Sequence, residues 1–331
     1  MTNRLTKRSP KWLTLLFSIF IFTVIGKNTN AQNYPTKPVR YVVAFSAGDS
    51  PDIVARIVTD KLSHLWDQQI IVENRTGAGG TIAGNFVAKS VADGYILFHC
   101  NIASNGIAPG LYNKLPYDGL NDFSPVSRIG STPNAFNVHP SIPVHTIKEL
   151  VARAIKNPGT LSYGHSGLGA SPHLSMELFK SVAHIDIAHV AYKGATPALM
   201  DLLGGQIPIM VSNLPALLPY SKSGKIRILA VTGLRRAAVL SEVPTVSESG
   251  YPGFDVNSWY GMCGPAGTPV PILEKLHTDL LKVLQMPEVN QRLSDMVVEP
   301  TPQSREDFTN FMKSEITRWT KVIKDANITK Q

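Results

Sequence analysis

Cysteine is scarce in this chain of 331 residues, which contains only Cys100 and Cys263. Two cysteines exclude a small scaffold held by several disulfides, and they exclude a zinc site built from cysteine alone, because that site needs four. Both cysteines lie among apolar or small neighbours. They could pair in an oxidising compartment or remain buried free thiols, and the sequence leaves both possibilities open.

Long hydrophobic runs are also few. The only extended run, at 12–25, is shorter than the roughly 20 residues that span a bilayer. Basic residues precede it, and Thr29-Asn30-Ala31 follows it with the small residues of a cleavage site. We therefore expect residues 1–31 to be a signal peptide cleaved before Gln32. An uncleaved membrane anchor is the alternative, and the mature protein is expected to be soluble outside the cytoplasmic membrane.

Acidic residues are fewer than basic residues, with 24 against 32, for a formal net charge of +8. Five of the basic residues and none of the acidic ones lie in the expected signal peptide, so 27 basic and 24 acidic side chains remain after it. This near-neutral remainder lacks the basic surface that nucleic-acid binding requires. With 43% hydrophobic residues, the chain can bury a core, and its length favours two lobes.

The familiar catalytic and cofactor motifs are missing. The segment Gly164-His165-Ser166-Gly167-Leu168 resembles a nucleophile elbow, but Leu168 stands where that motif needs glycine. The run at 77–80 fails as a dinucleotide fingerprint because Ile82 replaces its third glycine. No phosphate-binding Gly-Lys-Ser/Thr loop and no His-x-x-x-His zinc pair occur. We therefore predict no enzyme activity, no cofactor and no metal, and we interpret His165 and His173 as packed or capping side chains.

Beyond residue 33, short β-rich runs alternate with amphipathic segments. The expected strands are 39–45, 69–73, 95–100, 161–163, 187–191, 207–211 and 226–231. Helical periodicity follows the first strand, recurs at 81–91 and after Thr146, and dominates 271–284 and 306–326. The alternation predicts α/β sheets with right-handed crossovers, and its repetition predicts two closely coupled lobes.

Three strands lead into glycine-rich or serine-rich loops that open helices, at 46–52, 164–173 and 194–197. Ser50 and Ser171 are expected N-caps, each followed by proline in the first helical position. Helix N-termini present N–H groups to an anion, and glycine allows the anion to approach the backbone. Two such loops facing each other would form a clamp for a small anion. Ordinary strand–helix turns have the same composition, so that interpretation stays open.

A series of short motifs resembles one family. In chain order they are Tyr34-Pro35-x-Lys37-Pro38-Val39-Arg40, Val72-Glu73-Asn74-Arg75-x-Gly77-Ala78-Gly79-Gly80, Ala92-Asp93-Gly94-Tyr95, Leu115-Pro116-Tyr117-Asp118, Asp122-Phe123-x-Pro125-Val126, Ala191-Tyr192-Lys193-Gly194, Asp201-Leu202-Leu203-Gly204-Gly205, Val243-Pro244-Thr245-Val246 and Gly264-Pro265-Ala266-Gly267-Thr268-Pro269. Together they resemble the Bug-type extracytoplasmic solute receptors of tripartite tricarboxylate transporters, from residue 34 to about 328.

The resemblance implies a periplasmic binding protein of the type II, Venus-flytrap fold, with two α/β lobes joined by two crossing segments. We place lobe 1 at 34–131 plus 256–331 and lobe 2 at 132–255. It implies a monomeric receptor that binds a small organic acid or amino acid without metal or cofactor and passes it to a two-component membrane permease. A sensor that docks on a signalling protein is the alternative, and a secreted hydrolase is a weaker one.

The resemblance also implies which residues bind the ligand. They lie in the strand-end loops of both lobes: Phe45, Ser46, Ala47, Gly48, Asp49, Ser50, Asp52, Asn101, Ala103, Ser104, Ser166, Gly167, Gly169, Ala170, Ser171, His173, Tyr192, Lys193, Gly194, Ser212 and Asn213. Two of them depart from the family pattern, since Asp49 replaces a glycine and Ala170 a threonine. A carboxylate at Asp49 would repel an anionic ligand unless it points away or meets an ammonium group. On that basis we expect Asp49→Gly to strengthen carboxylate binding.

Overall fold

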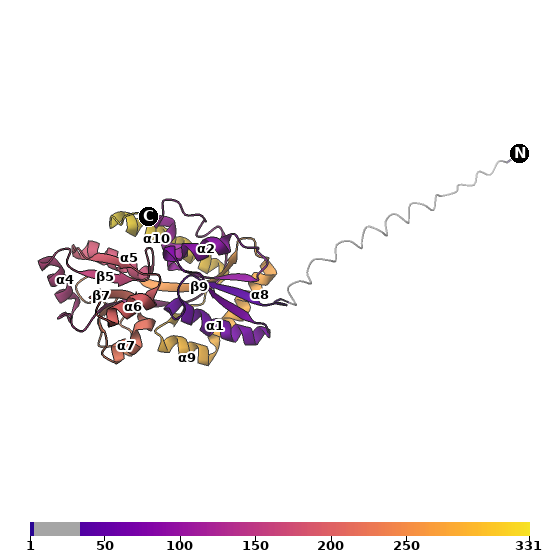
Figure 1. Ribbon diagram of the computed structural model, residues 1–331. Helices are drawn as coiled ribbons and strands as arrows, with labels where there is room; N and C mark the ends of the chain where they lie inside the picture. Colours follow the sequence, from indigo (N-terminus) through magenta and orange to yellow (C-terminus); the bar gives the residue numbers. More distant parts are fainter. Residues whose placement is uncertain (3–33) are drawn as a thin grey trace.

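The computed structural model describes residues 1–2 and 34–331, so the predicted signal peptide and its cleavage site lie outside the described residues, apart from Met1 and Thr2. Figure 1 shows two groups of helices and strands side by side, with β9 running between them. Each group has a β-sheet between two layers of helices. This is the predicted pair of α/β lobes.

Lobe 1 contains a sheet with the strand order β2-β1-β3-β9-β4. Strands β1, β2 and β3 are parallel, and β9 and β4 join in antiparallel pairing. Its main elements are β1 (Val39–Val43), α1 (Ser50–Trp66), β2 (Ile70–Asn74), α2 (Thr81–Ala88), β3 (Ile96–Asn101), a π-helix (Ile102–Ile107), α3 (Ala108–Leu111), β4 (Phe123–Val138), β9 (Asn257–Pro265), α8 (Val270–Gln285), α9 (Pro287–Asp295), β10 (Glu299–Pro300) and α10 (Arg305–Asp325).

Burial on both faces explains the nearly continuous apolar sequence of β1. Tyr41 and Val43 pack in a core cluster with α1, α8 and α9, whereas Val42 packs in another cluster with α2 and α10. All three side chains are fully buried. Alternate residues of a strand point to opposite faces, so a sheet covered on both sides favours apolar residues on both. Arg40, the one charged residue of β1, is only half-buried and forms an ion pair with Glu73.

Lobe 2 contains a second sheet, in which the parallel strands β6, β5 and β7 lie beside β4, and β8 also pairs with β4. Helices α4 and α5 cover one face and α6 and α7 the other (Figure 1). The elements are α4 (Ile147–Lys156), β5 (Ser162–His165), α5 (Ser171–Ala183), β6 (Ala188–Ala191), α6 (Ala195–Leu203), β7 (Ile209–Asn213), α7 (Leu218–Lys222) and β8 (Arg227–Val231), with 3₁₀ turns at Leu214–Leu217 and Ala238–Leu240.

The long strand β4 belongs to both sheets. It pairs with β9 as far as Pro133 and with β7 and β8 from Asn134 onward. The chain returns at Asn257, which pairs directly with Pro133. The two crossing segments therefore meet at one place. We propose that the boundaries between the lobes lie close to this place, near residues 131 and 255.

Two of the predicted helix caps are one residue away from the observed cap positions, and two strands were not predicted. Ser50 and Ser171 are the first residues of their helices, and the cap positions are Asp49 and Ala170. Thr146 caps α4 as predicted, because its hydroxyl accepts the N–H of Glu149 at 3.1 Å. Strands β4 and β9 were not predicted from the sequence, because their proline and glycine residues break the usual strand pattern.

The two cysteines form a disulfide between the neighbouring strands β3 and β9, with their Cα atoms 5.9 Å apart. Both residues are fully buried. The tertiary structure therefore decides in favour of pairing, which the sequence left open. Within the residues that the structure describes, no helix is both long enough and apolar enough to cross a membrane.

Candidate functional site

Loops from both lobes converge where parallel strands end. In lobe 1 they follow β1, β2 and β3, and in lobe 2 they follow β5, β6 and β7. In open α/β sheets, ligands bind at the carboxyl ends of the strands. Two cavities lie among these loops, and both are lined by residues of the two lobes.

The larger interlobe cavity has a volume of about 220 Å³. Most of its lining residues are glycine or have small side chains. They are Ala44, Phe45, Thr76, Gly77, Ala78, Gly79, Gly80, Ser166, Gly167, Leu168, Ala191, Tyr192, Lys193 and Gly194. Among these described lining residues, Lys193 is the one with a charged side chain, and it is exposed. The lining suits a small solute that hydrogen-bonds to main-chain groups and carries negative charge.

The smaller cavity lies next to the first, and Phe45 and Ser166 line both. Its volume is only about 10 Å³, which is at the lower limit for one water molecule. Its other lining residues are Pro51, Asn101, Ile102, Ala103, Ala170, Ser171, Pro172, Asn213, Ser258 and Tyr260.

Four polar residues from different elements form a hydrogen-bonded group at this smaller cavity. Asn213 donates to Asn134 and to Ser258, each at 2.6 Å. Ser171 donates to Asn134 at 3.3 Å, and the hydroxyls of Ser171 and Ser258 are also hydrogen-bonded to each other. Asn134 and Ser258 lie on the crossing strands, so this group ties lobe 2 to the connection between the lobes.

Asp49 of lobe 1 makes the principal polar contact with lobe 2. Its carboxylate accepts the backbone N–H of Ala195 at 3.0 Å, the N–H of Thr196 at 3.2 Å and the Thr196 hydroxyl at 3.1 Å. These donors form the first turn of α6, whose own cap residue is Gly194 and supplies no side chain. Asp49 therefore serves as the N-cap of a helix in the other lobe.

The Asp49 carboxylate lines neither cavity and is only 2% exposed. Burial raises the pKa of this carboxyl, while the hydrogen bonds from Ala195 and Thr196 act to lower it. The expected repulsion of an anionic ligand assumed that the carboxylate faces the site. Instead the carboxylate points away from the cavities and toward the first turn of α6, so it is not expected to repel an anionic ligand.

The lobes approach closely at two glycines. A Cβ atom at Gly79 of lobe 1 would collide with the carbonyl oxygen of Leu168 in lobe 2, and a Cβ atom at Gly194 would collide with the Ser46 hydroxyl. The Ser46 hydroxyl also donates to the Lys193 carbonyl at 2.8 Å. These contacts show that the lobes are closed on each other around the cavities.

Asp52 shapes the β1–α1 loop from within lobe 1. Its carboxylate accepts the N–H of Gly48 at 2.9 Å and hydrogen bonds from Arg56 and Asn74, also at 2.9 Å. Although burial opposes ionisation, these hydrogen bonds hold the pKa of Asp52 below its usual value. Asp52 is therefore a positioning residue for the loop that carries Phe45 and Ser46.

The residues predicted from the sequence fall into two groups. Those that line a cavity are Phe45, Asn101, Ala103, Ser166, Gly167, Ala170, Ser171, Tyr192, Lys193, Gly194 and Asn213. Those that line neither are Ser46, Ala47, Gly48, Asp49, Ser50, Asp52, Ser104, Gly169, His173 and Ser212. Most of the second group occupy the same loops and support their shape.

Three groups of lining residues were not among the predicted ligand-binding residues. The glycine-rich loop at 76–80 was considered only as a failed dinucleotide motif, although its motif in the family resemblance could have indicated it. Ser258 and Tyr260 come from β9, which was not predicted as a strand. The remaining residues are each next to a predicted residue in the chain, and they are Ala44, Pro51, Ile102, Leu168, Pro172 and Ala191.

A larger groove of about 600 Å³ lies elsewhere, beside the crossing strands. Arg235, Arg236, Asp255 and Glu299 are among its lining residues. None of the predicted ligand-binding residues lines it, and it is not at the carboxyl ends of the parallel strands. We therefore place the candidate site at the interlobe cavities.

Comparison with known proteins agrees with this fold and site. Residues 54–328 match the family described as the tripartite tricarboxylate transporter family receptor. The chain is 33% identical over 316 residues to BugT of Bordetella pertussis, covering 95% of this chain and 97% of that protein. The chain therefore belongs to the Bug-type receptors of the tripartite tricarboxylate transporter family, as the sequence motifs predicted.

Two solved structures of the same class are similar over most of their length. Rpa4515 of R. palustris, determined with adipate, is 37% identical with a TM-score of 0.87, covering 90% of this chain and all of that one. MatC of Rhodopseudomonas palustris, determined with bound malate, is 31% identical with a TM-score of 0.84, covering 88% and 100%. The fold is thus that of the periplasmic solute-binding proteins, and these relatives are binding receptors rather than enzymes.

Proposed function

We propose that this protein is an extracytoplasmic receptor that captures a small carboxylate-containing metabolite between its lobes and delivers it to a tripartite tricarboxylate-type permease. The observation that carries the proposal is the interlobe cavity, which is lined by loop residues of both lobes, most of them small, and by the exposed residue Lys193. Adipate and malate, named with two similar structures, are both dicarboxylates.

The cavity size favours a small solute. Its volume of about 220 Å³ is below the roughly 300–1,000 Å³ of pockets that enclose drug-sized ligands. The glycines at 77, 79 and 80 allow a ligand to approach the backbone, and no carboxylate side chain is among the described residues that line the cavity. A dicarboxylate of about four to six carbons fits this combination of size and charge.

Capture needs only closure of the lobes around the solute, without bond chemistry. Among the described side chains, the Ser166 hydroxyl forms no hydrogen bond with a histidine, so the arrangement of a serine hydrolase is not assembled. We therefore propose that the protein binds its solute without catalysing a reaction. A generic ester assay on the purified protein tests it, and hydrolysis abolished by Ser166→Ala would contradict it.

The binding experiment is a thermal-shift screen followed by calorimetry. The panel contains malate, adipate, a tricarboxylate, aspartate, a neutral amino acid and a diamine. At a ligand concentration 100 times the Kd, binding stabilises the protein by about 2.7 kcal/mol, which is readily measured. We expect a carboxylate to stabilise the protein. A shift produced only by the neutral or cationic compounds would overturn the proposed ligand class.

A matched pair of lysine variants locates the binding. Lys193→Ala is expected to weaken carboxylate binding, whereas Lys222→Ala, an exposed position on α7 of the same lobe, should leave it unchanged. Equal affinity in both variants would place the ligand elsewhere. Delivery is a separate question, tested by solute uptake in cells with and without the receptor and a tripartite permease.

A further inference from the structure

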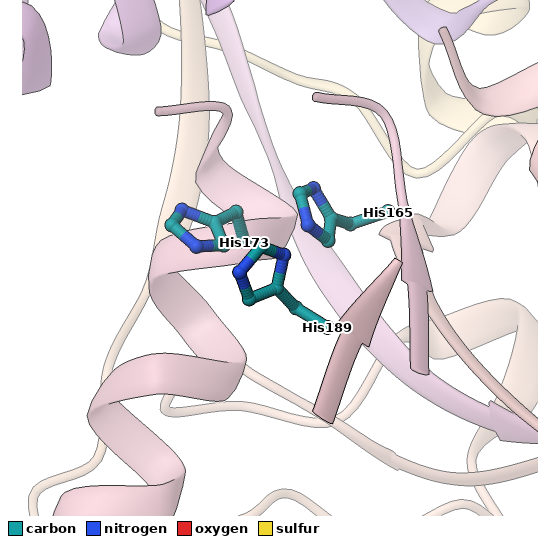
Figure 2. Close-up of side chains that lie close together, drawn as sticks. All are labelled: His165, His173 and His189. Atoms are coloured by element: carbon teal, nitrogen blue, oxygen red, sulfur yellow. The ribbon is translucent and has the colours of Figure 1, made fainter. Parts of the chain in front are cut away.

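Three histidines of lobe 2 come together behind the ligand loop. His165 ends β5, His173 lies in the first turn of α5, and His189 lies on β6. Figure 2 shows their rings gathered between these three elements. Each ring offers a nitrogen that lies within 4.8 Å of a nitrogen of the other two. We propose that these imidazoles form a binding site for a divalent transition-metal cation such as Zn²⁺.

The geometry is close to that of a coordinated metal. With bonds of about 2.0–2.1 Å, a tetrahedral zinc ion would hold its nitrogen ligands about 3.4 Å apart. The three rings therefore need to close together by little more than about 1 Å. His165 and His173 are buried and held by a strand and a helix, whereas His189 is exposed and can adjust. Its exposed position also gives the metal access from solvent.

One of the buried rings has a nitrogen that nothing else in the described part of the structure satisfies. The Nε2 atom of His165 is fully buried and has no hydrogen-bond partner among the described residues. A buried polar atom without a partner is costly, and a metal would satisfy it.

Two weak hydrogen bonds compete with the metal. Gly167 donates its N–H to Nδ1 of His165 at 3.2 Å, and Gly169 donates to Nδ1 of His173 at 3.3 Å. If the metal binds Nδ1, it replaces these hydrogen bonds. If it binds Nε2, the ring proton must move to Nδ1, and the N–H of Gly167 or Gly169 must turn away. Either route gives up two long hydrogen bonds, each contributing about 1 kcal/mol.

The ligand set indicates the class of metal. Three neutral imidazoles favour Zn²⁺, Cu²⁺, Ni²⁺ or Co²⁺ over Ca²⁺ and Mg²⁺, which prefer oxygen. Glu177, the nearest carboxylate to His165 on α5, is engaged by Lys180 at 3.0 Å and by the Tyr163 hydroxyl at 2.8 Å. Three protein ligands leave the fourth position to water. The site is open, not a closed structural one.

The metal site is separate from the solute cavities but connected to them. The segment 166–172 joins His165 to His173 and contributes Ser166 and Gly167 to the larger cavity and Ser171 to the smaller one. Fixing both ends of this segment would hold the loop in place. The inference does not depend on the proposed solute, because zinc binding can be measured with no carboxylate present.

Calorimetric titration of ZnCl₂ into the protein, purified without a polyhistidine tag, tests the inference. We expect one zinc ion per chain, and His189→Ala should weaken binding by about tenfold or more. His189 is exposed, so this variant should fold, and His189→Cys should retain binding because a thiolate also ligates zinc. His145→Ala, another exposed histidine of lobe 2, is the matched control and should bind as the wild type does.

Cobalt gives an independent readout. Co²⁺ bound by the three rings should produce visible absorption bands that are lost in His189→Ala and kept in His145→Ala. Zinc binding that survives His189→Ala would show that the metal sits elsewhere. The absence of binding by folded wild-type protein would likewise overturn the proposal.

Discussion

Thr196, at the start of α6 in lobe 2, donates both its backbone N–H and its hydroxyl to one carboxylate oxygen of Asp49 in lobe 1, at 3.2 and 3.1 Å. The contact joins residues 147 positions apart in the chain. It exists only when the lobes are closed, because the two groups belong to different lobes. Asp49 therefore stabilises the closed conformation, in addition to any ligand held within it.

Removal of the Asp49 carboxylate should weaken ligand binding. An N-cap contributes about 1–2 kcal/mol, so Asp49→Ala should raise the Kd for the bound carboxylate by about 5-fold to 30-fold. The geometry thus reverses our earlier expectation for Asp49→Gly, which assumed that the carboxylate faces the ligand. Calorimetry on Asp49→Ala measures the change. Asp60→Ala, at an exposed aspartate of α1, is the control, and unchanged or tighter binding by Asp49→Ala would refute the capping role.

Gly79→Ala should obstruct closure. The added methyl group would collide with the Leu168 carbonyl, and backbone atoms cannot move aside as a flexible side chain can. We expect a Kd increase of about tenfold or more, corresponding to about 1.4 kcal/mol, with only a small decrease in the free energy of unfolding.

Gly267→Ala is the matched control for Gly79→Ala. Gly267 also has a positive φ, at +83°, but a Cβ atom there meets nothing within 4 Å. Gly267→Ala therefore introduces a similar backbone strain but no collision with another group. Its affinity for the ligand should equal that of the wild type. Wild-type affinity in Gly79→Ala would show that the liganded lobes are not closed as they are in this structure.

Loss of the disulfide should destabilise lobe 1. The bond joins residues 163 positions apart, and cross-links of this kind typically stabilise proteins by about 2–5 kcal/mol. We expect the double variant Cys100→Ala/Cys263→Ala to lose stability in this range in urea denaturation. A reductant should lower the midpoint of the wild type and leave that of the double variant unchanged. Equal stability of the two proteins without reductant would contradict the pairing.

Acid should destabilise the protein partly through His99, a fully buried residue of β3. Its ring lies between Tyr41, whose hydroxyl is 2.9 Å from Nδ1, and Tyr260, and the charge of Asp52 acts on it weakly. Burial lowers the pKa of His99 to about 3, against roughly 6.5 for an exposed histidine. Between these values, as the pH falls, the unfolded chain takes up a proton that the folded protein rejects, so stability decreases.

This mechanism predicts a loss of up to about 1.4 kcal/mol per pH unit below pH 6.5 from His99 alone. Urea denaturation at pH 7.5 and pH 5.0 measures it. The loss should be about 2 kcal/mol smaller in His99→Gln than in the wild type. His145→Gln, at an exposed position, should show the wild-type pH dependence. An equal pH dependence in His99→Gln and the wild type would exclude His99 as the source.

The sequence by itself determined the local structure and the family. Largely apolar runs such as Val39–Val43 predict buried strands because burial on both faces favours apolar residues at successive positions. Thr146 predicts a helix start because its hydroxyl satisfies a free N–H of the first turn. The strand-end loops were predicted for the same local reasons. These features depend on residues close together in the chain.

Only the tertiary structure decided the relationships between distant residues. It paired Cys100 with Cys263, directed the Asp49 carboxylate into α6, and assembled His165, His173 and His189. It also placed β4 across both lobes, although Pro125, Gly130 and Pro133 obscure the strand in the sequence. Such contacts arise from strand order and lobe closure. No local pattern encodes them, because the energy that stabilises each one comes from a partner that folding brings near.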